Sequence, residues 1–322
     1  MLNRKSEFNV LVTGCAGFIG SNLVDRLLMD GYHVVGIDSF TNYYSQRVKW
    51  DNIRHALKNP NFRLIKADIL SASVVLPSDV DYVFHLAAQA GVRPSWGANF
   101  ETYSRNNIEV TQRVLETYKA DGLKKIIYAS SSSVYGDVAT PFSESGPVRP
   151  VSPYGVTKLA GEHLCYLYST AYSTPTVCLR YFTVYGPRQR PDMAINRFFR
   201  CALSGRTIFI YGDGSQVRDF TFVTDVVEGT LRAAFSPVSG AVNIGGGSRI
   251  SVRDLVALIA SIAKVKVNVE FVEPMRGDPD ATQADTTRQV AVLGWKPETD
   301  IEIGLRRYYE WFSTRKRILE RD

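Results

Sequence analysis

Tyr154 and Lys158 stand four residues apart in the segment SPYGVTK, downstream of a run of four serines. If a helix starts after Pro153, these two side chains share one face, and the phenol and the ammonium lie one turn apart. A free phenol, with a pKa of about 10, is a poor base near pH 7, but a neighbouring ammonium favours the phenolate. Ser131, on the loop after an apolar run, is placed to hydrogen-bond the same substrate hydroxyl. This trio suits the oxidation of a secondary alcohol by hydride transfer.

A glycine triplet, Gly14, Gly17 and Gly20, joins the first apolar run to a helical segment. Glycines at such a junction let a pyrophosphate approach the helix N-terminus. Asp38 closes the next apolar run, eighteen residues after Gly20, where a carboxylate accepts from the adenosine ribose hydroxyls. Because a carboxylate there repels a 2′-phosphate, the pattern predicts NAD rather than NADP. Asp68, after the third run, is either an adenine-pocket residue or a strand-end turn aspartate.

The elements that must position these residues form an alternating pattern. Apolar runs of strand length recur along the first part of the chain, with helix-length segments between them, which predicts an α/β fold with a doubly wound parallel sheet of the Rossmann type. After residue 183 the sequence is richer in Gly and Pro, and helices are expected at about 251–263 and 301–315. The predicted strands cover 8–13, 33–38, 62–68, 82–88, 124–130 and 176–182.

This change of composition predicts two regions. We expect an NAD-binding domain at 1–182, to which a segment near 219–246 returns. A smaller C-terminal region, 183–322, is expected to pack over the carboxyl ends of the strands and to bind substrate.

The composition excludes several classes of function. With 45% hydrophobic and 22% charged residues, the 322-residue chain has an ordinary globular composition. The longest apolar runs have strand length and the start MLNRKSEF lacks the apolar part of a signal peptide, so we expect no membrane span and a cytoplasmic location. The net charge of +6 is scattered apart from STRKR near the C-terminus, which does not indicate nucleic acid binding.

Cysteines and histidines give no metal signature. The four cysteines form no CxxC pair, and the four histidines are isolated from one another. We expect reduced, buried thiols, a core role for His85 and no metal site.

Several motifs together resemble those of the extended short-chain dehydrogenases/reductases, in their nucleotide-sugar epimerase group. The resemblance covers nearly the whole chain and includes GxxGxxG, HLAA at 85–88, NIEVT, SSVYG, YxxxK, LRYF and RDFTFVTD. It implies a retained NAD, a UDP-sugar substrate and a catalytic set of Ser131, Tyr154 and Lys158. The cofactor-binding residues that it implies are Gly14, Gly17, Phe18, Ile19, Gly20, Asp38, Asp68, Ile69, Ala87, Ala88, Asn107, Tyr154, Lys158 and Tyr181.

The same resemblance suggests where substrate binds. Arg218 in RDF and the segment Arg276–Asp278 match the family's nucleoside diphosphate clamp, in which arginine pairs with phosphate and aspartate accepts from ribose hydroxyls. Either arginine could instead belong to a surface ion pair. The full set of implied substrate-binding residues is Arg93, Ser132, Ser133, Thr183, Arg190, Arg218, Arg276 and Asp278.

The residues before VYG separate the reactions of this group. Related dehydratases have an Asp–Glu pair there and related decarboxylases a glutamate, whereas this chain has Ser132 and Ser133. No carboxylate is available for elimination, so the resemblance favours epimerisation at C4. In that cycle hydride leaves C4, the 4-keto sugar rotates so that its opposite face is presented, and the hydride returns to that face.

The sugar is indicated by RYFTVYGPRQRPDM, which carries Thr183 where galactose-type epimerases usually have asparagine, followed by Arg188 and Arg190. With AGVRPSW, this segment resembles UDP-glucuronate 4-epimerases. Hydroxyls of Ser132, Ser133 and Thr183 could hold the C5 carboxylate by neutral hydrogen bonds, with Arg190 assisting or closing the site.

Other readings stay open at this point. They are a UDP-glucose/UDP-galactose 4-epimerase, a UDP-glucuronate decarboxylase, a one-way NAD-dependent dehydrogenase and a non-enzymatic NAD sensor. The segment 100–118 and the helix that carries Tyr154 are expected to pair in a homodimer, as in this family.

Overall fold

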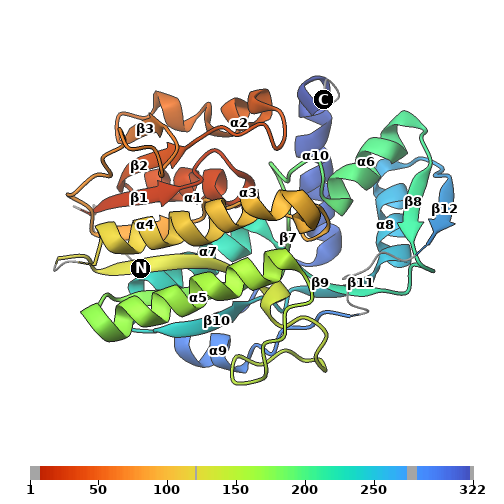
Figure 1. Ribbon diagram of the computed structural model, residues 1–322. Coiled ribbons are helices and arrows are strands. Elements are labelled where there is room, and N and C mark those ends of the chain that lie inside the picture. Colours follow the sequence, from red (N-terminus) through yellow and green to blue (C-terminus); the bar gives the residue numbers. More distant parts are fainter. Residues whose placement is uncertain (1–7, 120–121, 274–280, 320–322) are drawn as a thin grey trace.

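The central element of the fold is a parallel β-sheet, seen in a computed structural model that describes residues 8–119, 122–273 and 281–319. Within these residues the sheet has seven strands in the order β10-β6-β5-β4-β1-β2-β3 (Figure 1). The order reverses between β1 and β4, the switch point typical of a Rossmann sheet, so the predicted fold class is confirmed. The strands are β1 (Asn9–Thr13), β2 (His33–Asp38), β3 (Phe62–Lys66), β4 (Tyr82–His85), β5 (Lys125–Ser131), β6 (Thr176–Tyr181) and β10 (Gly240–Ile244).

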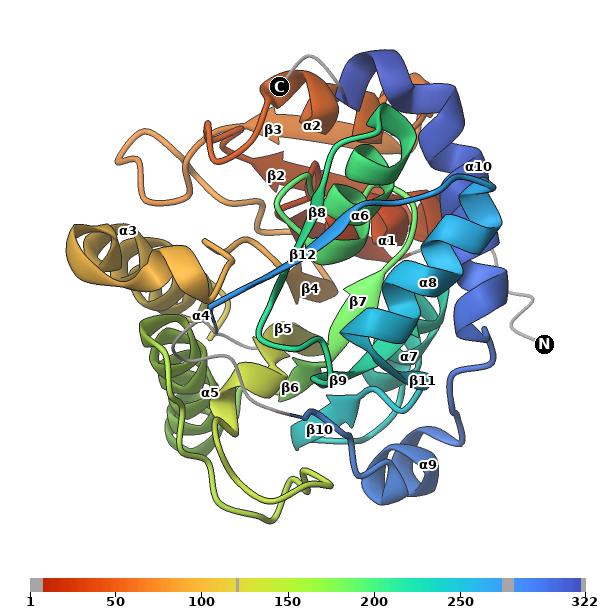
Figure 2. The same ribbon diagram turned by 90° about the vertical axis from the view of Figure 1, so that its right-hand side faces the viewer.

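Helices cover both faces of this sheet (Figure 2). Along β1, Val10 and Val12 pack toward helices α1 and α7, while Leu11 packs toward α4 and α5. This alternation follows from the two-residue period of a strand and explains why strands buried on both faces read as continuous apolar runs. The helices of these layers are α1 (Phe18–Met29), α7 (Val223–Phe235), α4 (Val110–Thr117) and α5 (Pro153–Tyr172), with α2 (Gln46–Ile53), α3 (Phe100–Ser104) and α9 (Thr287–Leu293) at the margins.

A smaller unit lies beyond the carboxyl ends of the sheet strands (Figure 1). Its core is built around Phe199, Leu255 and Tyr308, each buried. Its elements are the sheet β11-β9-β7, with β7 (Thr183–Tyr185), β9 (Val217–Phe222) and β11 (Ser248–Ser251), the pair β12-β8, with β8 (Ile208–Tyr211) and β12 (Val269–Val272), and helices α6 (Ala194–Ser204), α8 (Val252–Ala263) and α10 (Ile301–Leu319). Short 3-10 turns occur at η1 (Ala56–Lys58), η2 (Arg93–Ser95), η3 (Gly97–Asn99) and η5 (Ser132–Val134), and a π-helical turn, η4 (Arg105–Glu109), joins α3 to α4.

Helix α5, which carries Tyr154, begins where the sequence predicts. Ser152 is its N-cap and accepts a hydrogen bond from the Gly155 N–H at 3.1 Å, and Pro153 occupies the first helical position. The helix ends at Ser173, which adopts a left-handed conformation with φ of 56°.

A buried ion pair ties α5 to the sheet. Arg180 on β6 donates two hydrogen bonds to the Glu162 carboxylate, at 2.9 and 2.7 Å, and both side chains are less than a tenth exposed. The hydroxyl of Ser130 donates to the same carboxylate at 2.5 Å. The network therefore holds the end of β5, next to Ser131, against the helix that carries Tyr154.

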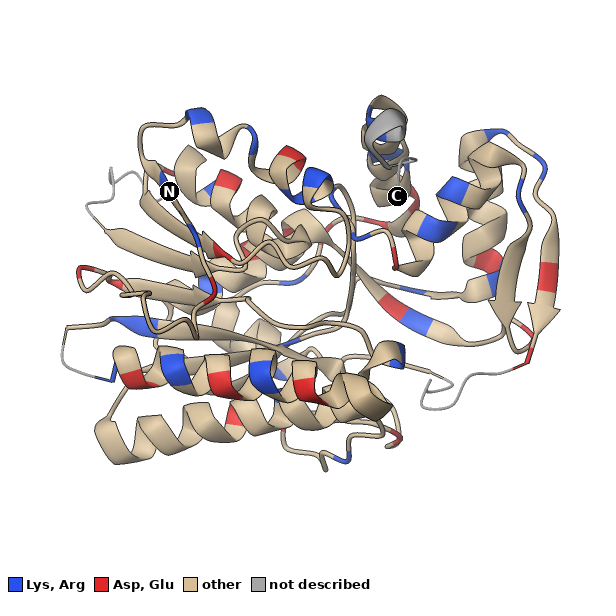
Figure 3. Ribbon diagram, turned by 45° about the horizontal axis from the view of Figure 1, so that its top comes forward, with Lys and Arg blue, Asp and Glu red and all other residues tan. Residues whose placement is uncertain are grey.

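Charge is mixed over the surface of the fold. Blue and red residues are scattered over the molecule, and they alternate along the helical segment that contains α3, η4 and α4 (Figure 3). Among the residues that the structure describes, no helix is both long and apolar enough to cross a membrane.

Removing one partner of the buried pair tests its role. We expect Arg180→Met to lower the free energy of unfolding by about 3–5 kcal/mol, because it leaves the Glu162 carboxylate buried without its counter-ion. Urea denaturation followed by circular dichroism measures the change. The double variant Arg180→Met/Glu162→Leu should recover much of the loss, and a double variant as unstable as the single one would contradict the charge argument.

Candidate active site

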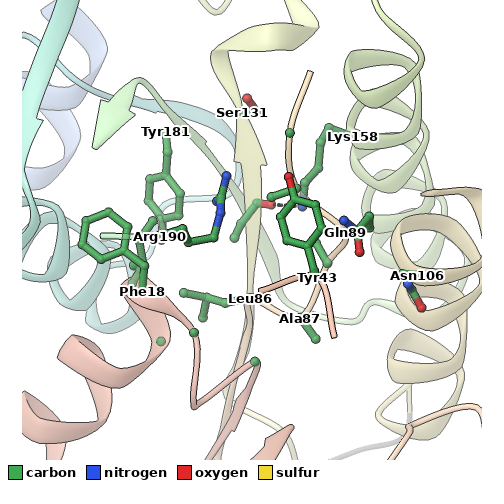
Figure 4. Close-up of a pocket in the computed structure, with 18 of the residues that line it drawn as sticks. Phe18, Tyr43, Leu86, Ala87, Gln89, Asn106, Ser131, Lys158, Tyr181 and Arg190 are labelled. Atoms are coloured by element: carbon green, nitrogen blue, oxygen red, sulfur yellow. Dashed lines mark hydrogen bonds between the residues drawn. The ribbon is translucent and has the colours of Figure 1, made fainter. Parts of the chain in front are cut away.

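A cavity of about 430 Å³ opens at the carboxyl ends of the central strands. Residues at or after the ends of β1, β2, β3, β4, β5 and β6 line it, together with the first residues of β7. Figure 4 shows the labelled side chains of Phe18, Tyr43, Ser131, Lys158 and Arg190 around this space. The topology alone thus brings the glycine turn and the Tyr154–Lys158 pair to one place.

The glycine turn forms one wall of the cavity. Gly14 has a φ of +70°, and a Cβ there would lie 2.8 Å from the Ala87 nitrogen. A Cβ on Gly20 would collide with the Gly14 carbonyl. The N-cap of α1 is Gly17, so no side chain accepts a hydrogen bond from the first N–H groups of the helix. The first turn of α1 carries no acidic residue, and its residues line the cavity. The unpaired N–H groups of this turn fit a dinucleotide diphosphate.

Asp38 stands at the end of β2 on the same wall. Its carboxylate accepts hydrogen bonds from the backbone N–H groups of Ala16, at 3.1 Å, and Phe40, at 2.8 Å. These bonds fix an acid where the sequence pattern predicts contact with ribose hydroxyls.

Asp68 lines the cavity and also has structural partners. It accepts from the Leu70 N–H at 2.9 Å and forms an ion pair with Arg105 at 2.7 Å. Its neighbour Ile69 lines the cavity too.

A buried hydrogen-bond chain supports the loop after β4. Thr13 accepts from the N–H groups of Leu86 and Ala87, so its hydroxyl proton points to Nδ1 of His85, 2.7 Å away. The ring is then the Nε2–H tautomer, which donates to Thr111 at 3.0 Å. Burial lowers the pKa of His85 to about 3, with the Lys158 charge adding to the effect, so the ring is neutral. The expected core role of His85 is confirmed.

The predicted catalytic residues meet in the cavity. Ser131 ends β5 and caps the 3-10 turn that follows it, while Tyr154 and Lys158 come from the first turns of α5. Lys158 donates from Nζ to the carbonyl of Ala129 at 2.8 Å and lies 5.1 Å from the centre of the Tyr128 ring.

Burial dominates the electrostatics of this pair. It raises the pKa of Tyr154, and the Ser131 hydroxyl and the Arg190 charge oppose that rise only in part. Burial also lowers the pKa of Lys158 to about 8. The sequence argument considered only nearby positive charge and so predicted a phenol with a lowered pKa; desolvation is the effect that it omitted.

Hydroxyl groups line the cavity beside Tyr154. Ser132, Ser133 and Thr183 are among the lining residues, and the Ser131 hydroxyl donates to that of Ser133 at 3.1 Å. Arg190 also lines the cavity, but its guanidinium makes two hydrogen bonds to Asp192, at 3.0 and 2.9 Å. Its charge is therefore already paired.

The carboxylates of the described lining lie in the dinucleotide-binding half of the cavity. Among the described residues that line the cavity, the acidic ones are Asp38 and Asp68, both after strands of the dinucleotide half. No Asp or Glu of this set accompanies Ser131 and Tyr154, which fits a reaction without elimination.

A π-helical turn, Arg105–Glu109, decides which of two asparagines reaches the cavity. Asn107, predicted to bind the cofactor, is buried: its amide donates to the Gln89 carbonyl and the Thr157 hydroxyl, at 3.0 and 2.9 Å, and accepts from the Gln89 N–H at 2.7 Å. Asn107 does not line the cavity, whereas its neighbour Asn106 does (Figure 4).

The other predicted residues divide by position. Phe18, Ile19, Ala87, Ala88 and Tyr181 line the cavity, and the Tyr181 hydroxyl hydrogen-bonds that of Thr230 at 2.9 Å. Arg93 and Arg218 do not line it: Arg93 lies over the ring of Tyr211, 4.3 Å from its centre, and Arg218 donates to the Val217 carbonyl at 3.0 Å. Arg276 and Asp278 lie outside the described residues.

Sequence reasoning missed part of the lining, above all the loop after Asp38. Tyr43, Tyr44 and Lys49 line the cavity from this loop and from α2, and Gln89 lines it after β4. A search of the residues just beyond the ribose-binding acid would have found the first three. Within the part of the chain that the structure describes, no group of three or more His, Cys, Asp and Glu residues could hold a metal ion.

Comparison with known proteins places the chain among nucleotide-sugar enzymes. The sequence model of the NAD dependent epimerase/dehydratase family matches residues 10–245. The crystal structure of UDP-glucuronic acid 4-epimerase from Bacillus cereus, in complex with UDP-glucuronic acid and NAD, is 42% identical, with a TM-score of 0.92, and the match covers 95% of this chain and 99% of that one.

Two relatives differ in the sugar that their names give. A protein of Bacillus subtilis (strain 168) called "Uncharacterized UDP-glucose epimerase YtcB" is 42% identical over 95% of this chain and 98% of its own. The UDP-glucuronate 4-epimerase of Thermodesulfobacterium geofontis (strain OPF15) is 37% identical over 94% of this chain and 95% of its own.

The depressed pKa of Lys158 predicts a pH-dependent stability. A lysine whose pKa falls from about 10.4 to about 8 on folding destabilises the folded chain below pH 8, and this cost fades as the pH rises toward the unfolded value. We therefore expect Lys158→Met to raise the urea midpoint at pH 7 and to lose that advantage toward pH 10. Lys296→Met, at an exposed site, is the control. An advantage that does not change with pH would argue against a buried ammonium.

Proposed function

The chain belongs to the NAD-dependent epimerase/dehydratase family, and on that premise we propose that it is a UDP-glucuronate 4-epimerase, which interconverts UDP-glucuronate and UDP-galacturonate. The family is NAD-dependent, so the predicted cofactor is confirmed. One observation carries the proposal: Ser131, Tyr154 and Lys158 share a cavity with the glycine turn, and the lining beside them offers hydroxyls instead of carboxylates.

Each residue of the catalytic set has a separate task. NAD, when bound, supplies the acceptor for the C4 hydride and its return to the opposite face. Tyr154 takes the proton of the C4 hydroxyl and gives it back when the ketone is reduced. Ser131 hydrogen-bonds the same oxygen and orients it. Lys158 supplies a positive charge that favours the phenolate, against the burial that raises the pKa of Tyr154.

A uronate substrate creates a hazard that the hydroxyl lining addresses. Oxidation at C4 gives a β-keto acid, which loses carbon dioxide when the bond to its carboxyl group aligns with the ketone π system. We propose that Ser132, Ser133 and Thr183 hold the carboxylate out of that alignment by several neutral hydrogen bonds. Arg190, paired with Asp192, contributes positive charge to this part of the cavity.

The residues for the nucleotide end of the substrate are assigned from the resemblance to the family's nucleoside diphosphate clamp. We propose that Arg218 and Arg276 bind the diphosphate, that Asp278 accepts from ribose hydroxyls, and that Arg93 assists. For Arg218 the support is its strand: β9 pairs with β7, which places Phe220 opposite Thr183.

Location and assembly follow as further proposals. We propose a cytoplasmic homodimer that forms through α4 and α5. In support, Tyr166 and Leu167 on α5 are 71% and 55% exposed, which is unusual for side chains of this size.

Product analysis tests the function. We expect the purified chain, with no added cofactor, to convert UDP-glucuronate to UDP-galacturonate in NMR spectra, with no net formation of NADH at 340 nm. Tyr154→Phe should lower the rate by at least 100-fold, since it removes the group that moves the proton. A UDP-pentose product would indicate a decarboxylase, turnover of UDP-glucose alone a neutral-sugar epimerase, and net NADH a one-way dehydrogenase.

Truncation of the hydroxyl lining tests the restraint. We expect Thr183→Ala, and more so Thr183→Ala combined with Ser133→Ala, to release severalfold more carbon dioxide and UDP-4-keto-pentose per epimerisation than the parent. Thr183→Ser keeps the hydroxyl and should behave like the parent. If the alanine variants lose rate but release no extra carbon dioxide, the hydroxyls bind the sugar without restraining its carboxylate.

A further inference from the structure

One buried ion pair contacts the residues on both sides of the serine turn, Ser131–Val134. Ser130, just before the turn, donates from its hydroxyl to the Glu162 carboxylate at 2.5 Å. Tyr135, just after the turn, lies with its ring against Arg180, and the guanidinium carbon is 4.8 Å from the ring centre. Because Arg180 and Glu162 are bound to each other by two hydrogen bonds, the two ends of the turn are linked through the pair.

The ring of Tyr135 is itself held in place. It is fully buried, and its hydroxyl donates to the side-chain oxygen of Asn243 at 2.7 Å. The amide nitrogen of Asn243 donates in turn to the carbonyls of Phe142 and Asp285, at 2.8 and 3.0 Å. The ring therefore cannot move away from Arg180 without breaking these bonds.

The serine turn packs directly on the helix that carries the catalytic side chains. A Cβ on Gly155 would lie 2.5 Å from the Ser133 carbonyl oxygen, so the backbones of the turn and of α5 are in contact. Tyr154, Lys158 and Glu162 follow one another at four-residue intervals along α5, which places them on one face of the helix. The carboxylate that holds the turn is thus fixed relative to the catalytic pair by the helix itself.

Stability alone does not explain why this contact is ionic. Taking two charges out of water is costly, and apolar residues of similar volume often replace a buried ion pair without loss of stability. An apolar pair cannot supply direction, whereas two hydrogen bonds between a guanidinium and a carboxylate fix the position and the orientation of both groups. The Glu162–Arg180 pair therefore suits the placement of the groups attached to it.

We propose that Glu162 and Arg180 are positioning residues, which hold the serine turn so that its hydroxyls meet the oxygen that Tyr154 deprotonates and the C5 carboxylate of the sugar. The part that concerns the carboxylate rests on the proposed function. Neither residue of the pair lines the cavity, so the pair acts through its neighbours, Ser130 and Tyr135.

The double variant Arg180→Met/Glu162→Leu separates position from stability, because it leaves no unpaired charge. Urea denaturation first establishes that it is folded. We expect kcat with UDP-glucuronate to fall about 10- to 100-fold, since a misplacement of about 1 Å can cost this much. KM should stay within about threefold, because the pair does not reach the residues assigned to UDP. Carbon dioxide released per epimerisation should rise severalfold.

A pH profile gives a readout that packing alone would not change. The Ser131 hydroxyl and the Arg190 charge both lower the pKa of Tyr154, and the double variant changes neither residue. If the turn moves, the hydrogen bond from Ser131 is lost and this pKa rises. The acid limb of kcat/KM should then move to higher pH in the double variant.

Two further variants serve as a rescue and as a control. Arg180→Lys can still form one charge-assisted hydrogen bond to Glu162, so it should be folded and retain more of the parent's kcat than the double variant. Arg26→Met/Glu228→Leu removes an Arg–Glu pair between α1 and α7, 3.0 Å apart, and neither residue lines the cavity. This control should match the parent in kcat, in pH profile and in carbon dioxide release.

A folded double variant with the parent's kcat and pH profile would overturn the proposal, and so would a loss confined to KM. Arg180→Lys with no more activity than the double variant would assign the effect to packing and overturn it too. A lower kcat without extra carbon dioxide would overturn the part that concerns the carboxylate. If the parent turns over UDP-glucose in place of UDP-glucuronate, the proposed function fails, but kcat and the pH profile still test the positioning with that sugar.

Discussion

The cofactor end of the site depends on a backbone approach that leaves no space for a side chain. The turn at Gly14 and the loop at Ala87 come so close that a single added methyl group would meet the Ala87 nitrogen. That approach exists because β1 and β4 are neighbours at the switch point of the sheet, and the Thr13–His85 chain fixes the two loops in register. The first turn of α1 is thereby left open toward the cavity, where its N–H groups can meet an anion.

Buried positive charge is the second organising feature, and each buried cation has a different set of partners. The charge of Arg180 is balanced by a carboxylate, whereas Nζ of Lys125 donates to three neutral carbonyls at and after the end of α7. Lys158 is held by one carbonyl and an aromatic ring, with a pKa lowered toward neutrality. Among the described residues, the lysines that line the cavity are Lys158 and Lys49, whose Nζ donates to Thr41. Buried cations of this kind tend to occur at functional sites.

The sequence was sufficient for six strands of the central sheet and for the residues tied to their ends, whereas β10 falls in the segment near 219–246 that was predicted to return to this domain but not as a strand. The strand over 33–38 has the predicted bounds, and the glycine turn, Asp38, Ser131 and Tyr154 meet as expected, because parallel strands bring their carboxyl ends to one edge. Helix α1 begins at Phe18, inside the glycine triplet, so the glycine turn itself enters the helix. The small strands β8 and β12 were not foreseen, because their pairing links residues 61 positions apart in a region of weak periodicity. Nor does spacing reveal desolvation, which reverses the expected pKa shift of Tyr154.

The π-helical turn between α3 and α4 constrains how this segment can evolve. One extra residue in that turn lets Asn107 point inward to Gln89 and Thr157 while Asn106 faces the cavity. Loss of any single residue there would restore an ordinary helix and rotate α3 by about 100° relative to α4. The length of the segment 105–109 is therefore constrained as tightly as Asn107 itself, so an alignment gap at this position would mark a protein with a rebuilt pocket.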